Sequence, residues 1–448
     1  MRIHFIAVGG SIMHSLAIAL HQAGHQVTGS DDQIYDPART KLDKAGLLPD
    51  KDGWDAERIT EDIDVIVLGM HAFEDNPELI RATILGLNIV SFPEFIFQQS
   101  QNKHRIVIAG SYGKTTITSM IMHVLKSEGR NFNYLVGANV PGFENSVKLD
   151  EDAPTLIVEG DEYLSSRMDR RPKFLLYQPH MVVISGISWD HINVFPTEDE
   201  YVDQFAFLLK SLEKAAVVIY NENDQRLTNL AKKYVDEDRQ YLHPFGIPSY
   251  KVKGGQYEIK IKGEKQKLQV IGKHNMANIA AAWEVCDLLG IEVVDFLKHM
   301  ATFTGAKSRM ETVSETENKL VIKDYAHAPA KVQATVEAVR ERYKKRNLIA
   351  CVELHTFSSL NKEFIPLYKN TLKKADYKII FIDPHALQKR RMPAISREDL
   401  VKAFGDKSLI YLTESSSIED TIRKCQTGDD VILMMSSGNF DGLNLKNL

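Results

Sequence analysis

The sequence predicts an α/β protein built from three parallel-sheet domains in series. Short apolar runs alternate with helical patterns along the whole chain of 448 residues, and such alternation is typical of parallel strands joined by helices. A chain of this length exceeds one ordinary hydrophobic core, and domains of about 150 residues give a count of three. The hydrophobic fraction of 44% and the charged fraction of 26% are those of a globular protein.

The first predicted domain covers residues 1–100. It begins with an apolar strand that runs into the glycine turn AVGGS, Ala7 to Ser11. Helical patterns follow at 11–24 and 76–86, and further strands are expected at 25–32, 63–70 and 87–92. The turn has Ala7 where the first glycine of a dinucleotide-binding loop would lie. It is therefore weak evidence for NAD, and another diphosphate fits as well.

The second predicted domain covers residues 101–305 and opens with a strand, a second glycine turn and a helix. Further strands are expected at 155–161, 180–188 and 215–224, and further helices at 200–214, 275–290 and 293–303. The stretch 257–272 alternates apolar and polar residues around Lys262-Gly263-Glu264. This pattern indicates an antiparallel hairpin attached to the parallel sheet.

The third predicted domain covers residues 306–448 and returns to the alternation of strands and helices. Strands are expected at 319–327, 347–354, 378–383, 408–412 and 429–437, and helices at 329–344, 364–375, 396–405 and 417–426. No low-complexity segment or short-period repeat interrupts the pattern.

Composition and charge exclude several classes of function. A net charge of −5 is small for this length and argues against sequence-independent binding of DNA or RNA. No apolar run reaches the roughly 18 residues that span a bilayer, and the N-terminus lacks a leader pattern. The cysteines at 286, 351 and 425 lie far apart, which suggests neither a disulfide framework nor a metal knuckle. We therefore expect a cytoplasmic protein without membrane insertion.

The segment Gly110-Ser111-Tyr112-Gly113-Lys114-Thr115-Thr116 lies between a strand and a helix, the setting that a phosphate-binding loop requires. Glycines let backbone amides turn towards an anion, a lysine reaches terminal phosphates, and a hydroxyl holds magnesium. The loop is shorter than the common pattern, because Ile108 stands where a glycine would be. The alternative is a strand–turn–helix junction with a fortuitous lysine.

Polar side chains follow the next two strands of this domain. Glu159 ends one strand and Asp190-His191 follows the other. Parallel strands place their carboxyl ends at one edge of the sheet, where ligands gather. A carboxylate and an imidazole there predict a second metal site, with Thr115 on the first metal. Each residue alone is more often a surface or capping group.

Three further segments carry candidate ligands. The amide side chains of Asn275 and Asn278, with His274, suit an adenine edge, and the alternative is N-capping by Asn275. Arg309 lies at the border of the second and third domains, where it could reach a γ-phosphate or form a salt bridge. Asp324 and His327 end the first strand of the third domain.

Together these motifs resemble the Mur ligases, ATP-dependent enzymes that join amino acids or peptides to UDP-N-acetylmuramic acid. The matching segments are AVGGSIMHSLA, VTGSDD, GSYGKTT, VEGDEY, DHINVFP, GKHNMAN, GAKSRME and DYAHAP. The resemblance covers essentially the whole chain. It implies a Rossmann-like UDP-binding domain, a central P-loop ATPase domain with a small antiparallel hairpin, and a C-terminal Rossmann-like domain.

The resemblance also implies an activity, which uses ATP and Mg²⁺. A muramyl carboxylate becomes an acyl phosphate, and an incoming amine displaces the phosphate. The segments VEGDEYLSSRMDRRPKF, VPGFENSVKL and GDDVILMMSSGNFDGL are most similar to the branch that attaches the recycled tripeptide L-alanyl-γ-D-glutamyl-meso-diaminopimelate. Addition of L-alanine is the alternative acceptor chemistry, and an NAD-binding oxidoreductase or nucleotide sensor is the alternative class. We expect a monomer or weak homodimer that binds no nucleic acid.

The roles implied by the resemblance fall into four groups. The UDP-sugar would contact Gly9, Gly10, Ser11, Ser30 and Asp31. ATP would contact residues 110–116, His274, Asn275, Asn278, Arg309 and Asp324. Catalysis would rest on Lys114, Glu159, His191 and Arg309, with magnesium on Thr115, Glu159 and His191. The amine substrate would meet His327 and His355.

Three positions depart from the family pattern. Tyr112 and Ala328 each stand where a histidine is usual, and the segment VELHTFSSL, residues 352–360, differs from the usual version. Because the third domain presents the amine, the last departure leaves the identity of the acceptor open.

Overall fold

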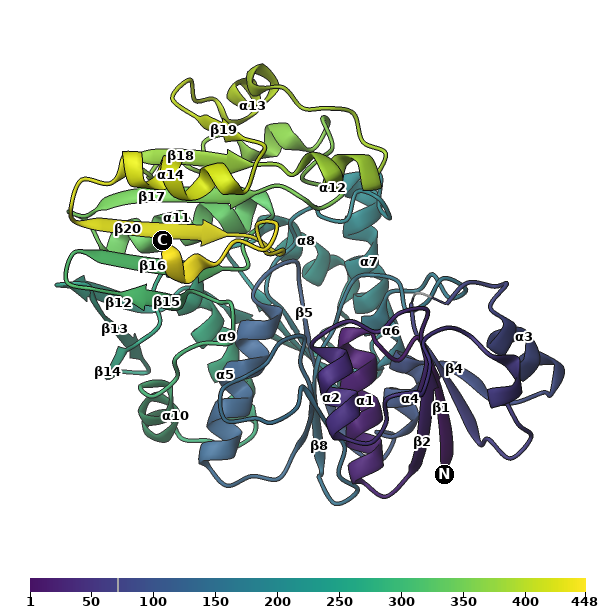
Figure 1. Cartoon of the computed structure of the whole chain (residues 1–448). Coiled ribbons are helices and arrows are strands. Elements are labelled where there is room, and N and C mark those ends of the chain that lie inside the picture. The colour runs from purple at the N-terminus through teal and green to yellow at the C-terminus, as the bar shows by residue number, and fades with distance from the viewer. Residues whose placement is uncertain (71) are drawn as a thin grey trace. The chain divides into compact units, whose positions relative to one another are not determined.

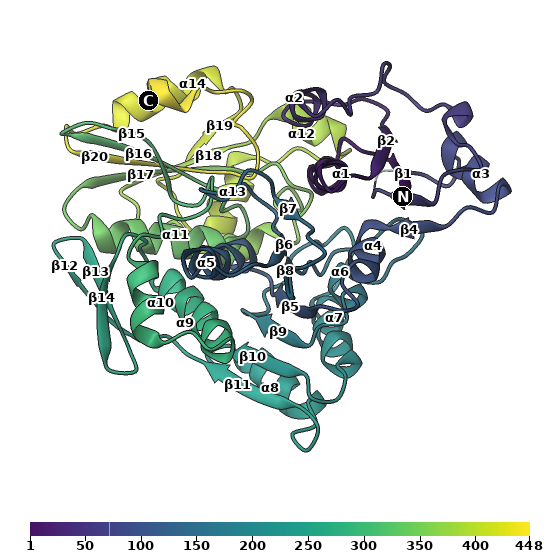
Figure 2. The same cartoon turned by 90° about the horizontal axis from the view of Figure 1, so that it is seen from below.

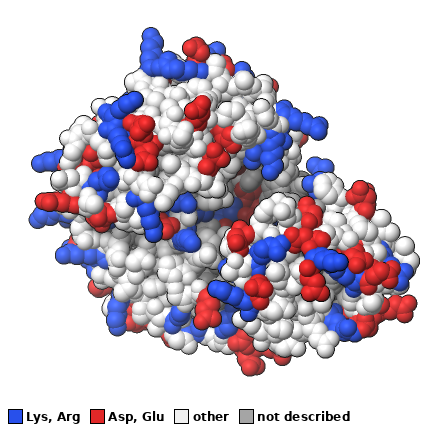
Figure 3. Space-filling model, in the orientation of Figure 1, with Lys and Arg blue, Asp and Glu red and all other residues white. Residues whose placement is uncertain are grey.

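The computed structural model describes residues 1–70 and 72–448, which form two compact units (Figure 1). One unit comprises residues 1–187 and 203–244, and the other comprises residues 188–202 and 245–448. In the described part of the chain no helix is long and apolar enough to cross a membrane. Acidic and basic side chains are interspersed over the face in Figure 3, in keeping with the small net charge of −5.

The N-terminal sheet has four parallel strands in the order β2-β1-β3-β4. Its strands are β1 (Arg2–Ile6), β2 (Gln26–Ser30), β3 (Val65–Leu68) and β4 (Ile89–Ser91), and its helices are α1 (Ser11–Gln22), α2 (Ala38–Lys44), α3 (Pro77–Ile84) and α4 (Phe92–Gln98). Side chains set where two helices begin: Asn76 caps α3, and Ser91 with Glu94 forms a capping box on α4. The predicted alternation in this region is confirmed.

The second sheet has seven strands in the order β11-β10-β9-β5-β8-β6-β7. They are β5 (His104–Ala109), β6 (Asn133–Leu135), β7 (Val147–Lys148), β8 (Thr155–Glu159), β9 (Met181–Ile184), β10 (Val217–Asn221) and β11 (Tyr241–Phe245). The helices are α5 (Lys114–Ser127), α6 (Lys173–Leu176), α7 (Glu198–Ser211) and α8 (Gln225–Tyr234). Strand β5 pairs in parallel with β8 and with β9. The chain segments that follow these three strands therefore leave the same edge of the sheet.

The other unit contains a small antiparallel sheet with strands β12 (Ser249–Lys253), β13 (Gln256–Ile261) and β14 (Glu264–Leu268). The predicted hairpin is confirmed as β13 and β14. Strand β12 was not predicted, because its sequence SYKVK is short and carries no apolar run. Helices α9 (Lys273–Leu288) and α10 (Val293–Met300) follow.

The C-terminal sheet has six strands in the order β15-β16-β20-β17-β18-β19. They are β15 (Glu311–Glu315), β16 (Lys319–Asp324), β17 (Asn347–Glu353), β18 (Tyr377–Phe381), β19 (Ile410–Leu412) and β20 (Asp430–Met435). The helices are α11 (Pro329–Arg342), α12 (Pro384–Lys389), α13 (Arg397–Phe404) and α14 (Ser416–Cys425). Edge strand β15 is antiparallel to β16, and the other pairings for which a register is defined are parallel.

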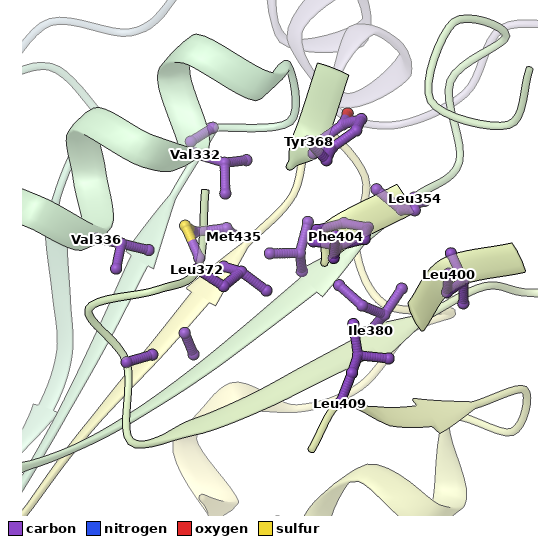
Figure 4. Packing of buried hydrophobic residues seen from close by; sticks show 14 of the residues in the cluster. Val332, Val336, Leu354, Tyr368, Leu372, Ile380, Leu400, Phe404, Leu409 and Met435 are labelled. Atoms are coloured by element: carbon purple, nitrogen blue, oxygen red, sulfur yellow. The ribbon is translucent and has the colours of Figure 1, made fainter. Parts of the chain in front are cut away.

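Both faces of the C-terminal sheet are covered, by α11 on one side and α14 on the other (Figure 2). The buried apolar residues between the sheet and α11 form the α11 layer, and those between the sheet and α14 form the α14 layer. Successive residues of β20 point to opposite faces, so Leu433 packs in the α11 layer and Ile432 packs in the α14 layer. In the α11 layer the labelled side chains of α11, the segment before β18 and strand β20 converge in one cluster (Figure 4). The central strands of this sheet are therefore apolar, and polar side chains such as Asp324 and Glu353 lie at their ends.

One helix prediction in this domain is wrong. Residues 364–375 form only a 3-10 turn, η2 (Ile365–Tyr368), instead of a helix. Asn370 adopts a left-handed backbone conformation with φ of 64°, and its amide donates to the carbonyl of Phe404. A contact with α13 thus replaces the continuing helical hydrogen bonds. The domain borders predicted after residues 100 and 305 remain predictions.

Two tyrosines of the small sheet contact helix α11. The Tyr257 hydroxyl donates to Glu341 Oε2 at 2.5 Å, and the Tyr250 hydroxyl donates to Glu341 Oε1 at 3.3 Å. The two rings stack with centroids 6.0 Å apart, and Tyr257 is fully buried. This contact joins the small sheet to the C-terminal sheet within one unit.

Replacing Tyr257 by phenylalanine deletes the stronger donor to the Glu341 carboxylate. We expect the free energy of unfolding of this unit to fall by about 1.5–3 kcal/mol, as for other hydrogen bonds to charged groups. Urea denaturation followed by tryptophan fluorescence measures it. The control Tyr241→Phe changes a tyrosine that is 60% exposed and should shift stability by less than about 0.5 kcal/mol. Equal effects of the two changes would show that the Glu341 contact contributes nothing.

Candidate functional site

Lys114 begins helix α5 and lies among carboxylates. Its Nζ donates to the Gly110 carbonyl at 2.8 Å and to Glu162 Oε2 at 2.7 Å, and it lies 3.6 Å from Asp161 Oδ1. Burial alone would lower the pKa of the ammonium, but the Glu162 and Asp161 carboxylates raise it above its usual range. Lys114, whose side chain is 12% exposed, is therefore a charged and largely buried cation at the start of a helix.

The backbone around Lys114 suits an anion. Gly113 is the N-cap of α5, and no side chain caps the helix. The first amides of an uncapped helix carry partial positive charge and lack intrahelical partners. This helix start has the backbone setting that a phosphate loop requires, and the role of residues 110–116 stays a prediction.

Thr115 and Glu159 meet beside this helix start. The Thr115 hydroxyl donates to Glu159 Oε1 at 2.8 Å, and the Gly137 amide donates to Glu159 Oε2 at 2.8 Å. Burial, followed by repulsion from Asp161, raises the pKa of Glu159. Lys114 acts in the opposite direction on this carboxylate. The Thr115 hydroxyl and the half-buried Glu159 carboxylate form an oxygen donor set that fits Mg²⁺. Across residues 1–70 and 72–448, no three His, Cys, Asp or Glu side chains gather closely enough to hold a metal by themselves.

Asp190 and His191 belong to the other unit. Asp190 Oδ1 accepts from the His191 amide at 2.8 Å, and Asp190 Oδ2 lies 3.8 Å from Lys331 Nζ. Burial opposes ionisation of Asp190, but Lys331, His191 and His327 outweigh it and lower its pKa to about 2. His191 has φ of 57°, a left-handed conformation that is uncommon for residues other than glycine. Lys331 was not predicted as a site residue.

The two predicted amine-site histidines lie at the carboxyl ends of C-terminal strands. His327 Nδ1 is 2.9 Å from the Tyr325 carbonyl, and burial followed by Lys331 lowers its pKa to about 3. Burial also lowers the pKa of His355, with Arg390 adding to the effect. His355 Nε2 lies 3.5 Å from Ser437 Oγ, and within the described residues its Nδ1 is buried without a hydrogen-bond partner. Both imidazoles are neutral near pH 7.

Glu353, next to this histidine pair, was missed by the sequence reasoning. It is 4% exposed and accepts hydrogen bonds from the Ser436 hydroxyl and from the Phe440 amide. These bonds fix the loop after β20 against the end of β17. The only signal in the sequence is a carboxylate at the end of an apolar strand.

The predicted adenine segment forms the first turns of α9. Gly272 is the N-cap and no side chain caps the helix, so the alternative of N-capping by Asn275 is wrong. Instead, Asn275 Nδ2 donates to the Ile271 carbonyl at 2.8 Å, and Asn278 Nδ2 donates to Asn275 Oδ1 at 3.2 Å. Burial lowers the pKa of His274, and the nearby Asp324 acts in the opposite direction.

Arg309 precedes β15 and Asp324 ends β16, so both lie at the open end of this antiparallel pair. The Arg309 guanidinium stacks over the Tyr325 ring, 4.4 Å from its centroid. Asp324 accepts from the Met310 amide at 2.8 Å and from the Ala326 amide at 2.9 Å. The Asp324 carboxylate therefore holds the backbone that carries Arg309.

The glycine turn of the N-terminal sheet binds a carboxylate of its own domain. The Gly9 amide donates to Asp31 Oδ2 at 2.7 Å. Burial and the neighbouring Asp32 raise the pKa of Asp31 to about 7. Ser30 is fully buried and donates to Glu78, so its hydroxyl already has a partner inside the protein.

The predicted residues divide between the two units. The first unit holds Gly9, Gly10, Ser11, Ser30, Asp31, residues 110–116 and Glu159, and the second holds His191, His274, Asn275, Asn278, Arg309, Asp324, His327 and His355. Lys114, Thr115 and Glu159 are brought together, as are His274 and Asp324. Glu162, the partner of Lys114, was not predicted. Its position in the same VEGDEY motif as Glu159 is the sequence feature that indicates it.

Comparison with known proteins identifies the same family along the chain. Residues 2–104 match the Mur ligase family catalytic domain, residues 108–286 the Mur ligase middle domain, and residues 308–438 the Mur ligase glutamate ligase domain. The chain is 26% identical to the UDP-N-acetylmuramate–L-alanine ligase of Carboxydothermus hydrogenoformans, over 100% of this chain and 96% of the relative. It is also 26% identical to the UDP-N-acetylmuramate–L-alanyl-γ-D-glutamyl-meso-2,6-diaminoheptandioate ligase of Haemophilus influenzae, over 99% and 98%.

Solved structures share the fold. UDP-N-acetylmuramate-alanine ligase from Thermotoga maritima superposes with a TM-score of 0.73 at 19% identity, over 99% of this chain and 97% of that one. A murein peptide ligase from Psychrobacter arcticus gives a TM-score of 0.68 at 23% identity, over 100% and 99%. With the three domain matches and the buried lysine of the phosphate loop, these likenesses lead to one conclusion: the chain belongs to the Mur ligase family and is an ATP-dependent ligase that forms amide bonds.

Proposed function

We propose that this ligase joins the carboxylate of UDP-N-acetylmuramate to the amine of the recycled tripeptide L-alanyl-γ-D-glutamyl-meso-diaminopimelate, with release of ADP and phosphate. The observation that carries the use of ATP is Lys114, a buried cation held at an uncapped helix start by Gly110 and Glu162. An oxidoreductase would have no use for such a lysine beside the Thr115–Glu159 pair.

The chemistry requires activation of a poor electrophile. A carboxylate oxygen of the sugar attacks the γ-phosphorus of ATP, and the bond from that phosphorus to the ADP oxygen breaks. The amine then attacks the acyl carbon, phosphate leaves, and the nitrogen loses a proton. Because every reactant is anionic, catalysis consists mainly of positioning and charge neutralisation.

Each group of residues takes one part of this task. Lys114 and Arg309 neutralise the γ-phosphate, and Thr115, Glu159 and His191 would hold Mg²⁺, which supplies further positive charge to the phosphates. His274, Asn275 and Asn278 contact adenine, and Asp324 lies near the ribose. The UDP end binds at Gly9, Gly10, Ser11 and Asp31. Ser30, which the resemblance also implied, is fully buried and bonded to Glu78, so it has no surface to offer the ligand.

The charges around the amine site favour the tripeptide over L-alanine. Lys331 acts electrostatically on His327, and Arg390 on His355. The tripeptide brings several carboxylates, whereas L-alanine brings one. Asp190 and Glu353 offset part of the charge of Lys331 and Arg390, and the two cations still offer more partners to the larger anion. L-alanine remains the second candidate because relatives of both activities match at 26% identity.

The Lys114→Ala variant should lose phosphate release almost completely, because the γ-phosphate loses its buried cation. We expect a fall of at least about 100-fold in kcat, comparable to the loss of one oxyanion donor, with unchanged affinity for UDP-N-acetylmuramate. Phosphate release and calorimetric titration of the UDP-sugar measure the two quantities. Lys126→Ala, at the other end of α5, is the matched control and should retain activity. Activity that required NAD and survived Lys114→Ala would contradict the ligase mechanism.

The acceptor is tested by phosphate release with ATP and UDP-N-acetylmuramate. We expect kcat/KM for the tripeptide to exceed that for L-alanine by at least about tenfold, which corresponds to about 1.4 kcal/mol of extra recognition. Arg390→Ala should raise KM for the tripeptide and leave KM for ATP unchanged. A preference for L-alanine would assign the alternative activity instead.

Because the predicted site residues come from both units, we expect the chain to close on its substrates. Small-angle scattering should show a smaller radius of gyration with a non-hydrolysable ATP analogue and UDP-N-acetylmuramate than without them. ATP analogue alone serves as the comparison. An unchanged radius with both ligands bound would contradict closure.

A further inference from the structure

The three residues that follow β9, Ser185 to Ile187, are hydrogen-bonded to the phosphate loop. The Ser185 amide donates to the Ala109 carbonyl at 3.1 Å, and the Ser111 amide donates to the Gly186 carbonyl at 3.0 Å. The buried Ser185 hydroxyl donates to the Tyr112 carbonyl, and a second acceptor, the Ala109 carbonyl, lies 3.3 Å away. The loop is thus attached to this segment on both sides of its turn.

Packing between the two segments leaves no room for additional atoms. A Cβ on Gly110 would lie 2.2 Å from Ser185 Oγ, and a Cβ on Gly186 would lie 1.9 Å from the Tyr112 hydroxyl. Tyr112 therefore rests directly on the backbone at Gly186, which explains why both positions are glycine. Its contact with protein gives Tyr112 a role other than touching ATP.

The segment is itself anchored to the sheet. Asn221 Nδ2 donates to the Ser185 carbonyl at 3.0 Å, and the Ile187 amide donates to Asp224 Oδ2 at 2.7 Å. Asp224 also caps helix α8. Residues 185–187 thus form a platform that is fixed by β10 and α8.

The hydrogen bond from Ser185 determines the direction of one peptide group. In a trans peptide the carbonyl oxygen and the following N–H point in opposite directions. Since the Tyr112 carbonyl is held towards Ser185, the Gly113 N–H points away from the platform. We propose that Ser185 is a positioning residue of the phosphate loop, which acts through the Tyr112 carbonyl to direct the Gly113 amide at the phosphates of ATP. This inference rests on the proposed use of residues 110–116 for ATP.

The loss of this bond would have a clear chemical consequence. Without the hydroxyl, the peptide between Tyr112 and Gly113 can rotate, and the rotated form presents a carbonyl oxygen to the phosphates instead of an N–H. An anion site depends on donors that are oriented before the ligand arrives. Ser185 therefore contributes to ATP binding and to phosphoryl transfer without touching either reactant.

Ser185→Ala removes one oxygen and tests the inference. We expect the Kd and KM for ATP to rise at least about tenfold and kcat to fall, because one backbone donor is no longer aligned. KM for UDP-N-acetylmuramate should change less than about twofold. Calorimetric titration with ATP and Mg²⁺, together with phosphate release, measures these quantities.

The matched control is Ser100→Ala. Ser100 is also buried, and its hydroxyl donates to the Ile96 carbonyl at 2.8 Å at the end of α4. Both variants should melt at similar temperatures, and only Ser185→Ala should lose ATP affinity. If Ser185→Ala bound ATP as well as Ser100→Ala did, the inference would be overturned. A wild-type chain that bound no ATP would instead overturn the proposed function.

Discussion

The burial of the Lys114 ammonium is the constraint around which the central sheet is organised. A buried cation is stable only when it is paired and hydrogen-bonded, and Gly110 with Glu162 meets that need. Pairing requires that β8, which leads to Glu162, lie directly beside β5, which leads to the loop. The strand order and the pairing at the sheet edge are thus consistent with each other. Strand β5 lies between β8 and β9. Strand β8 therefore brings Glu159 to Thr115, and β9 brings residues 185–187 to the loop.

In the C-terminal domain, too, buried polar groups need hydrogen-bond partners, because its sheet is covered on both faces. Because α11 and α14 cover the two faces, polar side chains occur at the strand ends, and each must find partners there. Asp324 accepts two backbone amides, and Glu353 accepts one amide and one hydroxyl. These carboxylates are therefore fixed in place. They hold the backbone around Arg309 and the loop beside His355, two of the predicted ligands, through hydrogen bonds at the edge of this sheet.

Local features of the sequence predict the elements well, and pairings between distant residues poorly. The alternation of apolar runs predicts the strands, and the glycine turn with Lys114 predicts the loop, since both depend on neighbours in the chain. The partner of Lys114 is Glu162, and that of Asp190 is Lys331. No periodicity encodes such partners, because each follows from strand order and helix placement. The helix predicted at 364–375 is absent for the same reason. The Asn370 amide donates to the Phe404 carbonyl, and the helix propensity of the segment does not indicate this distant contact.

Tyr112, one of the departures from the family pattern, is explained by its contact with a second residue, Gly186. Taken alone, a tyrosine in a phosphate loop is hard to explain, because its ring is large and the loop is tight. The structure places that ring where a side chain at position 186 would be, and position 186 is glycine. The large Tyr112 side chain is therefore accommodated because Gly186 has no side chain. The two residues lie 74 positions apart in the sequence but in adjoining segments at one sheet edge. A change at either one alters the surface that the other packs against, and only the platform anchored by Asn221 and Asp224 keeps that surface in place.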